Sequence, residues 1–283
     1  MPFGNSVQIY QERQNKTSSE VSLRLPVVDL RARSQLGELD LYKNRMESSQ
    51  APFHAQHYLG DNKIHVLLAA SGSVATIKLP NIAEALSRHS NISIRIIVTK
   101  SAAEFLKGQS HEQPLLESLL ELPGVDAIYR DEDEWRHPWT RGEPILHIEL
   151  RKWAHLLLIA PLSANTMAKM TMGISDNLLL SVLRAWDTTG MVDVGFKEKK
   201  PLVFVAPAMN TAMWKHPITE KQLAILKGEW GVNSSNTEGW VSVLHPIEKD
   251  LACGDTGVGG MMEWRSIVGK VEQYLGIGKD DEQ

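Results

Sequence analysis

Short apolar runs alternate with amphipathic segments along most of this chain. The runs are almost continuously apolar, which is typical of strands covered on both faces of a parallel sheet. They span residues 64–70, 92–98, 155–160, 202–206 and 241–244. Segments with helical spacing lie at residues 76–89, 164–172, 178–185, 218–230 and 264–275. This alternation predicts an α/β fold, a doubly wound Rossmann-like (flavodoxin-like) parallel sheet with helices on both faces, in three layers.

The first part of the chain lacks this pattern. Residues 1–62 mix Gln, Ser, Arg and Glu with scattered apolar residues. Such a segment buries too little apolar surface to offset the entropy of ordering, so we expect a disordered tail. The sequence therefore predicts a single domain at residues 63–276, followed by a short tail at residues 277–283.

Two charged stretches are predicted to be surface loops added to this plan. They lie at residues 130–139 and 188–200. Their charge indicates solvated loops. Trp135 and Trp139 in the first stretch could instead cover a pocket or a subunit contact.

Composition limits the class of partner. The chain has 30 basic and 34 acidic residues and a formal net charge of −4, which gives no reason to expect nucleic acid or a membrane as partner. No apolar run approaches the ~20 residues that cross a bilayer. Residues 1–5 do not begin a signal sequence, and the single cysteine cannot form an intrachain disulfide. We expect a soluble, cytoplasmic protein.

Hydroxyl and glycine residues follow the first two predicted strands, where ligands bind in open α/β sheets. The first strand leads into Gly72-Ser73-Val74 and the second into Thr99-Lys100-Ser101. Glycine lets a phosphate approach the backbone, and free N–H groups at a helix start favour an anion. Ordinary helix capping explains both segments as well. From the residues alone, phosphate binding and capping both stay open.

The next two strand ends are also polar. Ser163-Ala164-Asn165-Thr166 places three hydrogen-bonding side chains at a strand-to-helix junction, although capping needs only one of them. The following strand ends near Ala208, and Asn210 lies just before Met213 and Trp214. Core packing explains the methionine and the tryptophan. It explains Asn210 poorly, because a buried amide is costly unless its donors and acceptors are used.

A glycine-dense loop holds the only cysteine of the chain. Asp250-Leu251-Ala252 leads into Cys253, and Gly259 lies in the glycine-rich stretch that follows. Glycines at this density favour a mobile flap over a ligand. A lone cysteine in a strand would indicate a small core residue, but a Gly/Asp loop is no core position, so we interpret Cys253 as a functional thiol. His147, in a short predicted helix, is by itself more typical of a structural histidine.

Together these motifs resemble the homo-oligomeric flavin-containing cysteine decarboxylase family. The resemblance extends from about residue 63 to about residue 275. The motifs that carry it are Gly72-Ser73-Val74-Ala75, His147-Ile148-Glu149-Leu150, Ala160-Pro161-Leu162-Ser163-Ala164-Asn165-Thr166, Ser175-Asp176-Asn177-Leu178-Leu179, Arg184-Ala185-Trp186-Asp187, Pro207-Ala208-Met209-Asn210-Thr211-Ala212-Met213-Trp214 and Ala252-Cys253-Gly254-Asp255. The last two patterns are highly specific together, whereas the first alone would be weak.

The resemblance implies roles for particular residues. An FMN site is implied at Gly72, Ser73, Val74, Thr99, Lys100, Ser101, Ser163, Ala164, Asn165, Thr166 and Ala208. His147 is implied to be the active-site base, Asn210 to hold the substrate carboxylate, and Cys253 to be the acid that completes the reaction. Further substrate contacts are implied at Asp250, Leu251, Ala252, Met213 and Gly259. No metal is expected, because no Cys/His cluster has metal-site spacing.

The implied reaction is the FMN-dependent decarboxylation of 4'-phosphopantothenoylcysteine to 4'-phosphopantetheine in coenzyme A biosynthesis. Oxidation of the carbon that bears sulfur gives a thioaldehyde, which accepts the electrons released when carbon dioxide leaves. His147 would help to remove the thiol proton. Re-reduction, with protonation by the Cys253 thiol beneath a closed flap, then completes a redox-neutral reaction.

The resemblance also implies a homotrimer in which His147 of one subunit meets Asn210 and Cys253 of a neighbour. Two other activities stay open. Some fungal members of the family are inhibitory subunits of a serine/threonine protein phosphatase, and others of the family decarboxylate peptidyl cysteine. The presence of His147, Asn210 and Cys253 in one chain favours a self-sufficient enzyme.

Overall fold

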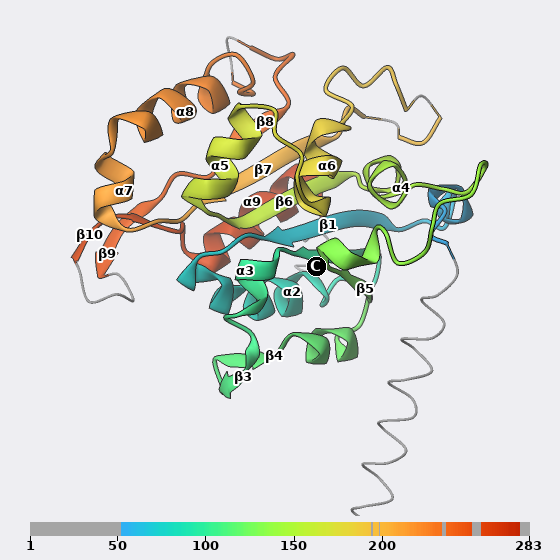
Figure 1. Ribbon diagram of the computed structural model, residues 1–283, viewed down its shortest axis with the longest axis horizontal. Coiled ribbons are helices and arrows are strands. Elements are labelled where there is room, and N and C mark those ends of the chain that lie inside the picture. The colour runs from blue at the N-terminus through green and yellow to red at the C-terminus, as the bar shows by residue number, and fades with distance from the viewer. Residues whose placement is uncertain (1–51, 194, 198, 234–235, 251–255, 278–283) are drawn as a thin grey trace, which may run out of the picture. The chain divides into compact units, whose positions relative to one another are not determined.

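The centre of the protein is a six-stranded parallel sheet (Figure 1). The computed structural model describes residues 52–193, 195–197, 199–233, 236–250 and 256–277. The strands of the sheet are β1 (Ile64–Ala70), β2 (Ile92–Val98), β5 (Val125–Tyr129), β6 (Leu156–Leu162), β7 (Leu202–Pro207) and β8 (Val241–Val243). Their order is β5-β2-β1-β6-β7-β8 and every neighbouring pair is parallel. This order is that of doubly wound Rossmann-like sheets, so the predicted fold class is confirmed.

Helices cover both faces of the sheet, because successive strand residues point to opposite sides. Leu68 of β1 belongs to a core with α2 (Leu79–Leu86) and α9 (Trp264–Leu275). Its neighbour Leu67 belongs to a second core on the other face. The helices of that second core are α4 (Leu146–Trp153), α5 (Ala164–Thr171), α6 (Leu178–Arg184) and α8 (Pro217–Lys227). Both residues are fully buried, which explains why the strand pattern is continuously apolar.

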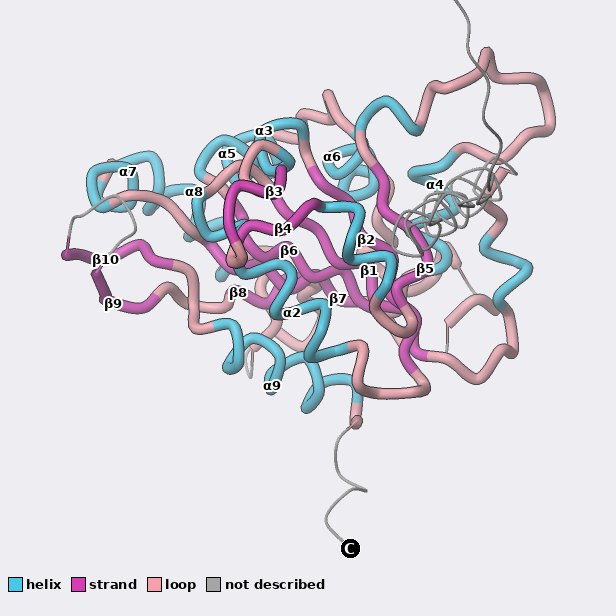
Figure 2. Tube along the Cα trace, turned by 90° about the horizontal axis from the view of Figure 1, so that it is seen from below, coloured by secondary structure: helices cyan, strands magenta, loops and turns pink. Residues whose placement is uncertain are grey.

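Shorter strands and helices lie outside the central sheet. Two antiparallel pairs are present, β3 (Lys107–Ser110) with β4 (Gln113–Leu115) and β9 (Ile247–Asp250) with β10 (Thr256–Gly260). The short helices are α3 (Lys100–Ala103), α7 (Thr211–Lys215), η1 (Ala55–Tyr58), η2 (Val74–Lys78), η3 (Leu116–Glu121) and η4 (Asp131–Asp133). Figure 2 shows the β9–β10 pair beside α7, at the end of the sheet where the strands β6 and β7 finish.

The folded part of the chain begins earlier than we expected. Residues 1–51 lie outside the described residues, but part of residues 52–62, which we placed in the tail, packs against the domain. Ala55 is buried and its N–H donates to Glu149 at 2.8 Å. The Arg95 guanidinium lies 4.0 Å from the centre of the Phe53 ring and donates to the Tyr58 hydroxyl at 2.7 Å. Phe53 and Tyr58 have no periodic spacing with other apolar residues, so the sequence did not indicate that both contact Arg95.

One further strand and one further boundary differ from the sequence prediction. The edge strand Val125–Tyr129 was not predicted, because its apolar residues are interrupted by Asp126 and follow a leucine-rich segment. Ile277, which we placed in the C-terminal tail, packs against the core. Within the described part of the chain, no helix is both long and apolar enough to cross a membrane. No group of three or more His, Cys, Asp or Glu in that part could hold a metal ion.

Candidate active site

Ser71 joins the carboxyl ends of β1 and β6. It is fully buried, and its Oγ donates to the Pro161 carbonyl at 3.0 Å while accepting the Ser163 N–H at 2.8 Å. The strand order reverses between β1 and β6, and ligands of doubly wound folds bind at this point. The sequence alone does not single out Ser71, because a serine after a strand does not reveal which distant loop it contacts.

Gly72 lets the loop after β2 approach the loop after β1. A Cβ built at Gly72 would lie 2.3 Å from Ser101 Oγ and 2.7 Å from Ser101 Cβ, so any side chain would collide there. Thr99 caps α3 by accepting the Ala102 N–H at 3.4 Å, whereas Lys100 and Ser101 are exposed. The two predicted phosphate loops therefore lie together, with a hydroxyl and a cation on their surface.

The loop after β1 continues into η2 in the same way. Ser73 accepts the Ala75 N–H at 3.4 Å, so capping accounts for one of its hydrogen bonds. Val74 is largely exposed despite its apolar side chain. Val74 lies beside the glycine and hydroxyl groups of this loop. Contact with a flat ring would remove its apolar surface from water, which favours such a contact.

The loops after β6 and β7 complete this edge of the sheet. Ser163 accepts the Thr166 N–H at 3.2 Å, its hydroxyl donates to Thr166 Oγ1 at 3.2 Å, and both side chains are buried. Capping therefore accounts for these two residues, while Asn165 is exposed. The Ala208 N–H donates to the Leu162 carbonyl at 2.9 Å, which brings the end of β7 beside them. All four predicted cofactor segments thus lie at one edge.

Asn210 begins α7 at the border of this edge. Its side chain accepts the Met213 N–H at 2.8 Å, so it is the N-cap of that helix, and it is exposed rather than buried as we reasoned from the sequence. Capping therefore accounts for its carbonyl oxygen, whereas its amide N–H₂ makes no hydrogen bond among the described residues. Beside it, Thr211 Oγ1 is buried without a hydrogen bond among the described residues.

Gly259 holds the β9–β10 pair against Met209, the residue before Asn210. Its carbonyl accepts the Met209 N–H at 3.0 Å, and a Cβ at Gly259 would lie 2.7 Å from the Met209 carbonyl oxygen. Its φ of +116° is a conformation that favours glycine. Asn210, Met213 and Gly259, all predicted to contact substrate, are therefore neighbours.

The tip of the predicted flap lies outside the described residues. Leu251, Ala252 and Cys253, including the proposed acid, belong to this stretch. Asp250 ends β9 and is paired with Thr256 of β10, so the backbone on both sides of the tip is a hairpin. The glycine-dense segment that we predicted as a mobile loop thus contains strand β10, whose pairing depends on backbone groups and not on side-chain pattern.

His147 lies in the first turn of α4 and contacts Glu134. Its Nδ1 is hydrogen-bonded to the Glu134 carboxylate, and the exposed fractions of the two side chains are 22% and 4%. The sequence singled out His147 but not Glu134, because Glu134 belongs to the acidic stretch that we interpreted as solvated. That interpretation was wrong for this residue.

A single chain does not bring His147 and Asn210 together. Helix α4 packs against α6 and η1, whereas α7 packs against β10 and α8. Both views place α4 and α7 far apart, on opposite sides of the molecule's centre (Figures 1 and 2). The strand-end loops and Asn210 thus share one region of the chain, and His147 lies outside it. Trp135 and Trp139 are 62% and 49% exposed in the single chain.

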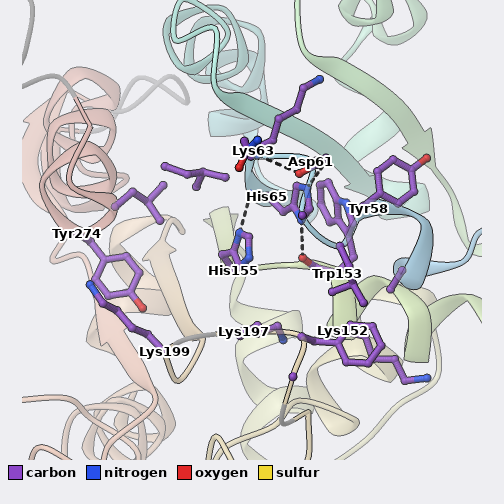
Figure 3. A pocket seen from close by; sticks show the side chains of 18 residues that line it. Tyr58, Asp61, Lys63, His65, Lys152, Trp153, His155, Lys197, Lys199 and Tyr274 are labelled. Atoms are coloured by element: carbon purple, nitrogen blue, oxygen red, sulfur yellow. Dashed lines mark hydrogen bonds and ion pairs between the residues drawn. The ribbon is translucent and has the colours of Figure 1, made fainter.

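A second polar cluster lies at the opposite, amino end of the strands (Figure 3). It lines a cavity of about 580 Å³. The His65 ring stacks on the His155 ring with centres 4.8 Å apart, and the His65 N–H donates to His155 Nδ1 at 2.9 Å. Burial and the neighbouring His65 lower the pKa of His155 to about 4. Burial likewise lowers the pKa of Lys197 to about 8, although Asp193 lies 3.7 Å from its Nζ.

Comparison with known proteins identifies the family. The family model described as Flavoprotein matches residues 54–276. The chain belongs to the flavoprotein family. A phosphopantothenoylcysteine decarboxylase of Arabidopsis thaliana is 46% identical over 75% of this chain and 85% of its own length. A probable thymidylate synthase of Schizosaccharomyces pombe is 44% identical over 78% of this chain, which spans only 31% of that protein.

Solved structures of flavoproteins agree with this assignment. A mutant PPC decarboxylase complexed with pantothenoylaminoethenethiol is 40% identical, with a TM-score of 0.58 over 76% of this chain and 99% of the other. The FMN binding protein AtHal3 is 42% identical, with a TM-score of 0.57 over 76% of this chain and 97% of the other. The resemblance that the sequence motifs indicated is therefore confirmed at the level of the family and the fold.

Proposed function

We propose that the protein decarboxylates 4'-phosphopantothenoylcysteine with bound FMN. The observation that carries this proposal is the joining of four strand-end loops at one edge, with Asn210 at its border. The Gly72 cradle, the exposed Lys100 and Ser101, and the outward Asn165 suit a cofactor that carries both a phosphate and a ring. Similarity to a phosphopantothenoylcysteine decarboxylase and to an FMN binding protein supports the choice of substrate and cofactor.

The residues at this edge would hold the cofactor by backbone and hydroxyl contacts. Gly72 and Ser101 would approach its phosphate, and Lys100 would neutralise its charge. The chemistry that bound FMN supplies is oxidation of the substrate carbon that bears sulfur, followed by return of the same electrons. Ser71 would contribute indirectly, because its two hydrogen bonds hold the loops after β1 and β6 at a fixed separation.

The chain's own groups would handle the carboxylate and the protons. The Asn210 amide can donate to the substrate carboxylate without adding a positive charge that would oppose its loss. His147 would accept the thiol proton during oxidation. Cys253 would return a proton after carbon dioxide has left, in a site that the predicted flap would close from water.

His147 and Asn210 would meet across a subunit boundary. Their separation within one chain supports this proposal, since both are assigned to the same reacting substrate. A homotrimer would place α4 of one copy against the strand-end loops of the next. Trp135 and Trp139, exposed in the single chain, would then contact a neighbour.

The decisive experiment measures carbon dioxide released by the full-length, FMN-loaded protein. We expect release from 4'-phosphopantothenoylcysteine and none, or far less, from a peptide that ends in cysteine. The reverse preference would favour a peptidyl-cysteine decarboxylase. No release from either compound by folded, yellow protein would overturn the enzyme proposal and leave inhibition of a serine/threonine phosphatase as the activity to test.

Mixing inactive subunits tests the shared site. His147→Asn and Cys253→Ser variants should each be inactive in forming 4'-phosphopantetheine, the second because it decarboxylates but stalls before reduction. Mixed oligomers should regain part of the activity, since some interfaces pair an intact His147 with an intact Cys253. Absence of rescue in verified mixed trimers would place each site within one chain.

A further inference from the structure

Glu134 is the feature of the site that the family motifs leave unexplained. We propose that Glu134 is a positioning residue that fixes the tautomer and orientation of the His147 imidazole. This inference rests on the proposed function, in which His147 accepts the substrate thiol proton. It rests independently on geometry, because the Glu134 carboxylate is hydrogen-bonded to His147 Nδ1.

Burial makes this contact energetically important. The Glu134 side chain is only 4% exposed, and its hydrogen bond to His147 is its only side-chain hydrogen bond among the described residues. A carboxylate removed from water is costly unless it is paired and hydrogen-bonded. By contrast, Glu132, two residues earlier, is exposed and has no hydrogen bond or ion pair among the described residues. Solvation therefore accounts for Glu132 but not for Glu134.

The turn that carries Glu134 is anchored at two other points. Asp133 accepts the Arg130 N–H at 2.6 Å and closes the turn around η4. Asp131 accepts the Leu178 N–H at 3.1 Å, which attaches the turn to the start of α6. Helix α6 packs against α4, the helix of His147. The acidic turn is thus held beside α4, and the Glu134 side chain extends from the turn to the His147 imidazole.

The hydrogen bond determines which ring nitrogen carries the proton. An ionised carboxylate can only accept, so Nδ1 must donate and the neutral ring is the Nδ1–H tautomer. Nε2 is then left with its lone pair and can accept a proton from a thiol. After that transfer the imidazolium formed is stabilised by the adjacent carboxylate. Glu134 therefore acts through His147 and does not itself contact the substrate.

Replacement of Glu134 by glutamine tests the proposal. Glu134→Gln keeps the size of the side chain and removes its charge, and Glu132→Gln makes the same change two residues away on an exposed side chain. We expect kcat to fall about 10- to 100-fold in E134Q, with KM changed less than about twofold because the substrate-binding groups are untouched. E132Q should match the wild type. E134D, which restores the carboxylate, should recover part of kcat.

Nitrogen chemical shifts of His147, assigned by comparison with the His147→Asn variant, give a readout that does not depend on activity. We expect the Nδ1–H tautomer in the FMN-loaded wild type and mainly the Nε2–H tautomer in E134Q. An Nε2–H tautomer in the wild type, or E134Q with wild-type kcat, would overturn the inference. A wild type with the Nδ1–H tautomer but no carbon dioxide release would instead refute the proposed function and leave the Glu134 contact standing.

Discussion

The two ends of the parallel sheet carry polar residues that are used in different ways. At the amino end, His65, His155 and Asp61 are stacked on or bonded to one another. At the carboxyl end, Ser163 and Thr99 cap helices while neighbours such as Asn165 face outward. These three amino-end side chains are therefore engaged with one another within the fold. At the carboxyl end, some polar side chains remain exposed and available to bind a ligand.

Two large pKa shifts belong to the polar cluster at the amino end of the sheet. Burial lowers the pKa of His155 and of Lys197, and both lie at the amino end, in the wall of the cavity in Figure 3. Strongly perturbed groups in a cleft are often candidates for catalysis, but structural networks perturb pKa values as well. Here both groups lie at the end of the sheet opposite the strand-end loops that hold the predicted cofactor residues. For His155 and Lys197 we therefore interpret the shifts as features of a structural network.

The largest expected effect is on substrate binding at the carboxyl end, where a negative charge is introduced at Asn210. Asn210→Asp keeps an oxygen that can accept the Met213 N–H, and aspartate is as good an N-cap as asparagine, so α7 should remain intact. The new carboxylate would face the carboxylate of the substrate, and such like-charge contacts cost several kcal/mol. We expect KM to rise by at least about 100-fold. Steady-state kinetics with unchanged FMN content would check this, and a wild-type KM would remove Asn210 from carboxylate binding.

A smaller effect is expected from filling the Gly72 cradle. In Gly72→Ala the added methyl group would collide with Ser101, and overpacking of this kind costs about 1–3 kcal/mol. We expect FMN to bind about 10- to 100-fold more weakly, measured by fluorescence titration. Gly269→Ala is the matched control, because a Cβ there has no atom within 4 Å. Equal FMN affinity in the two variants would contradict the role of the Gly72 loop.

Much of the carboxyl end could be predicted from the sequence, because the parallel fold brings strand ends to one edge. The strands Ile64–Ala70 and Ile92–Val98 follow directly from their apolar runs, and the residues after them could be assigned before any contact was known. The joining of the loops could not. Ser71 and Ser163 are far apart in sequence, and no local pattern reveals that one bonds to the other.

The sequence alone does not show which residues of the acidic stretch are solvated and which are buried. A run of acids is usually solvated, and this holds for Glu132 but fails for Glu134, which is buried against His147. Only the position of α4 beside the acidic turn distinguishes them. The position of α4 likewise decides that His147 is far from Asn210 in one chain, a separation that the motifs implied only through a family resemblance.

The smallest expected effect concerns the amino end and depends on pH. His155 is neutral in the folded protein down to pH about 4, whereas in the unfolded chain it takes up a proton below its ordinary pKa of 6.5. The unfolded state therefore binds more protons within this window, and acidification lowers the free energy of unfolding. Because the ring is partly exposed to solvent, we expect a loss of no more than about 2 kcal/mol across the window.

His155→Asn isolates this contribution, because an amide oxygen can still accept the His65 N–H. Urea unfolding at fixed protein concentration and fixed excess FMN should give a shallower dependence on pH between 6.5 and about 4 in this variant than in the wild type. The exposed His111→Asn change should leave that dependence unaltered. Carbon dioxide release near neutral pH should be the same in all three proteins, since neither His155 nor His111 is assigned to the cofactor or substrate site. An identical pH dependence in H155N and wild type would show that His155 is not held neutral, and a selective loss of activity would show that the two ends of the sheet are not functionally separate.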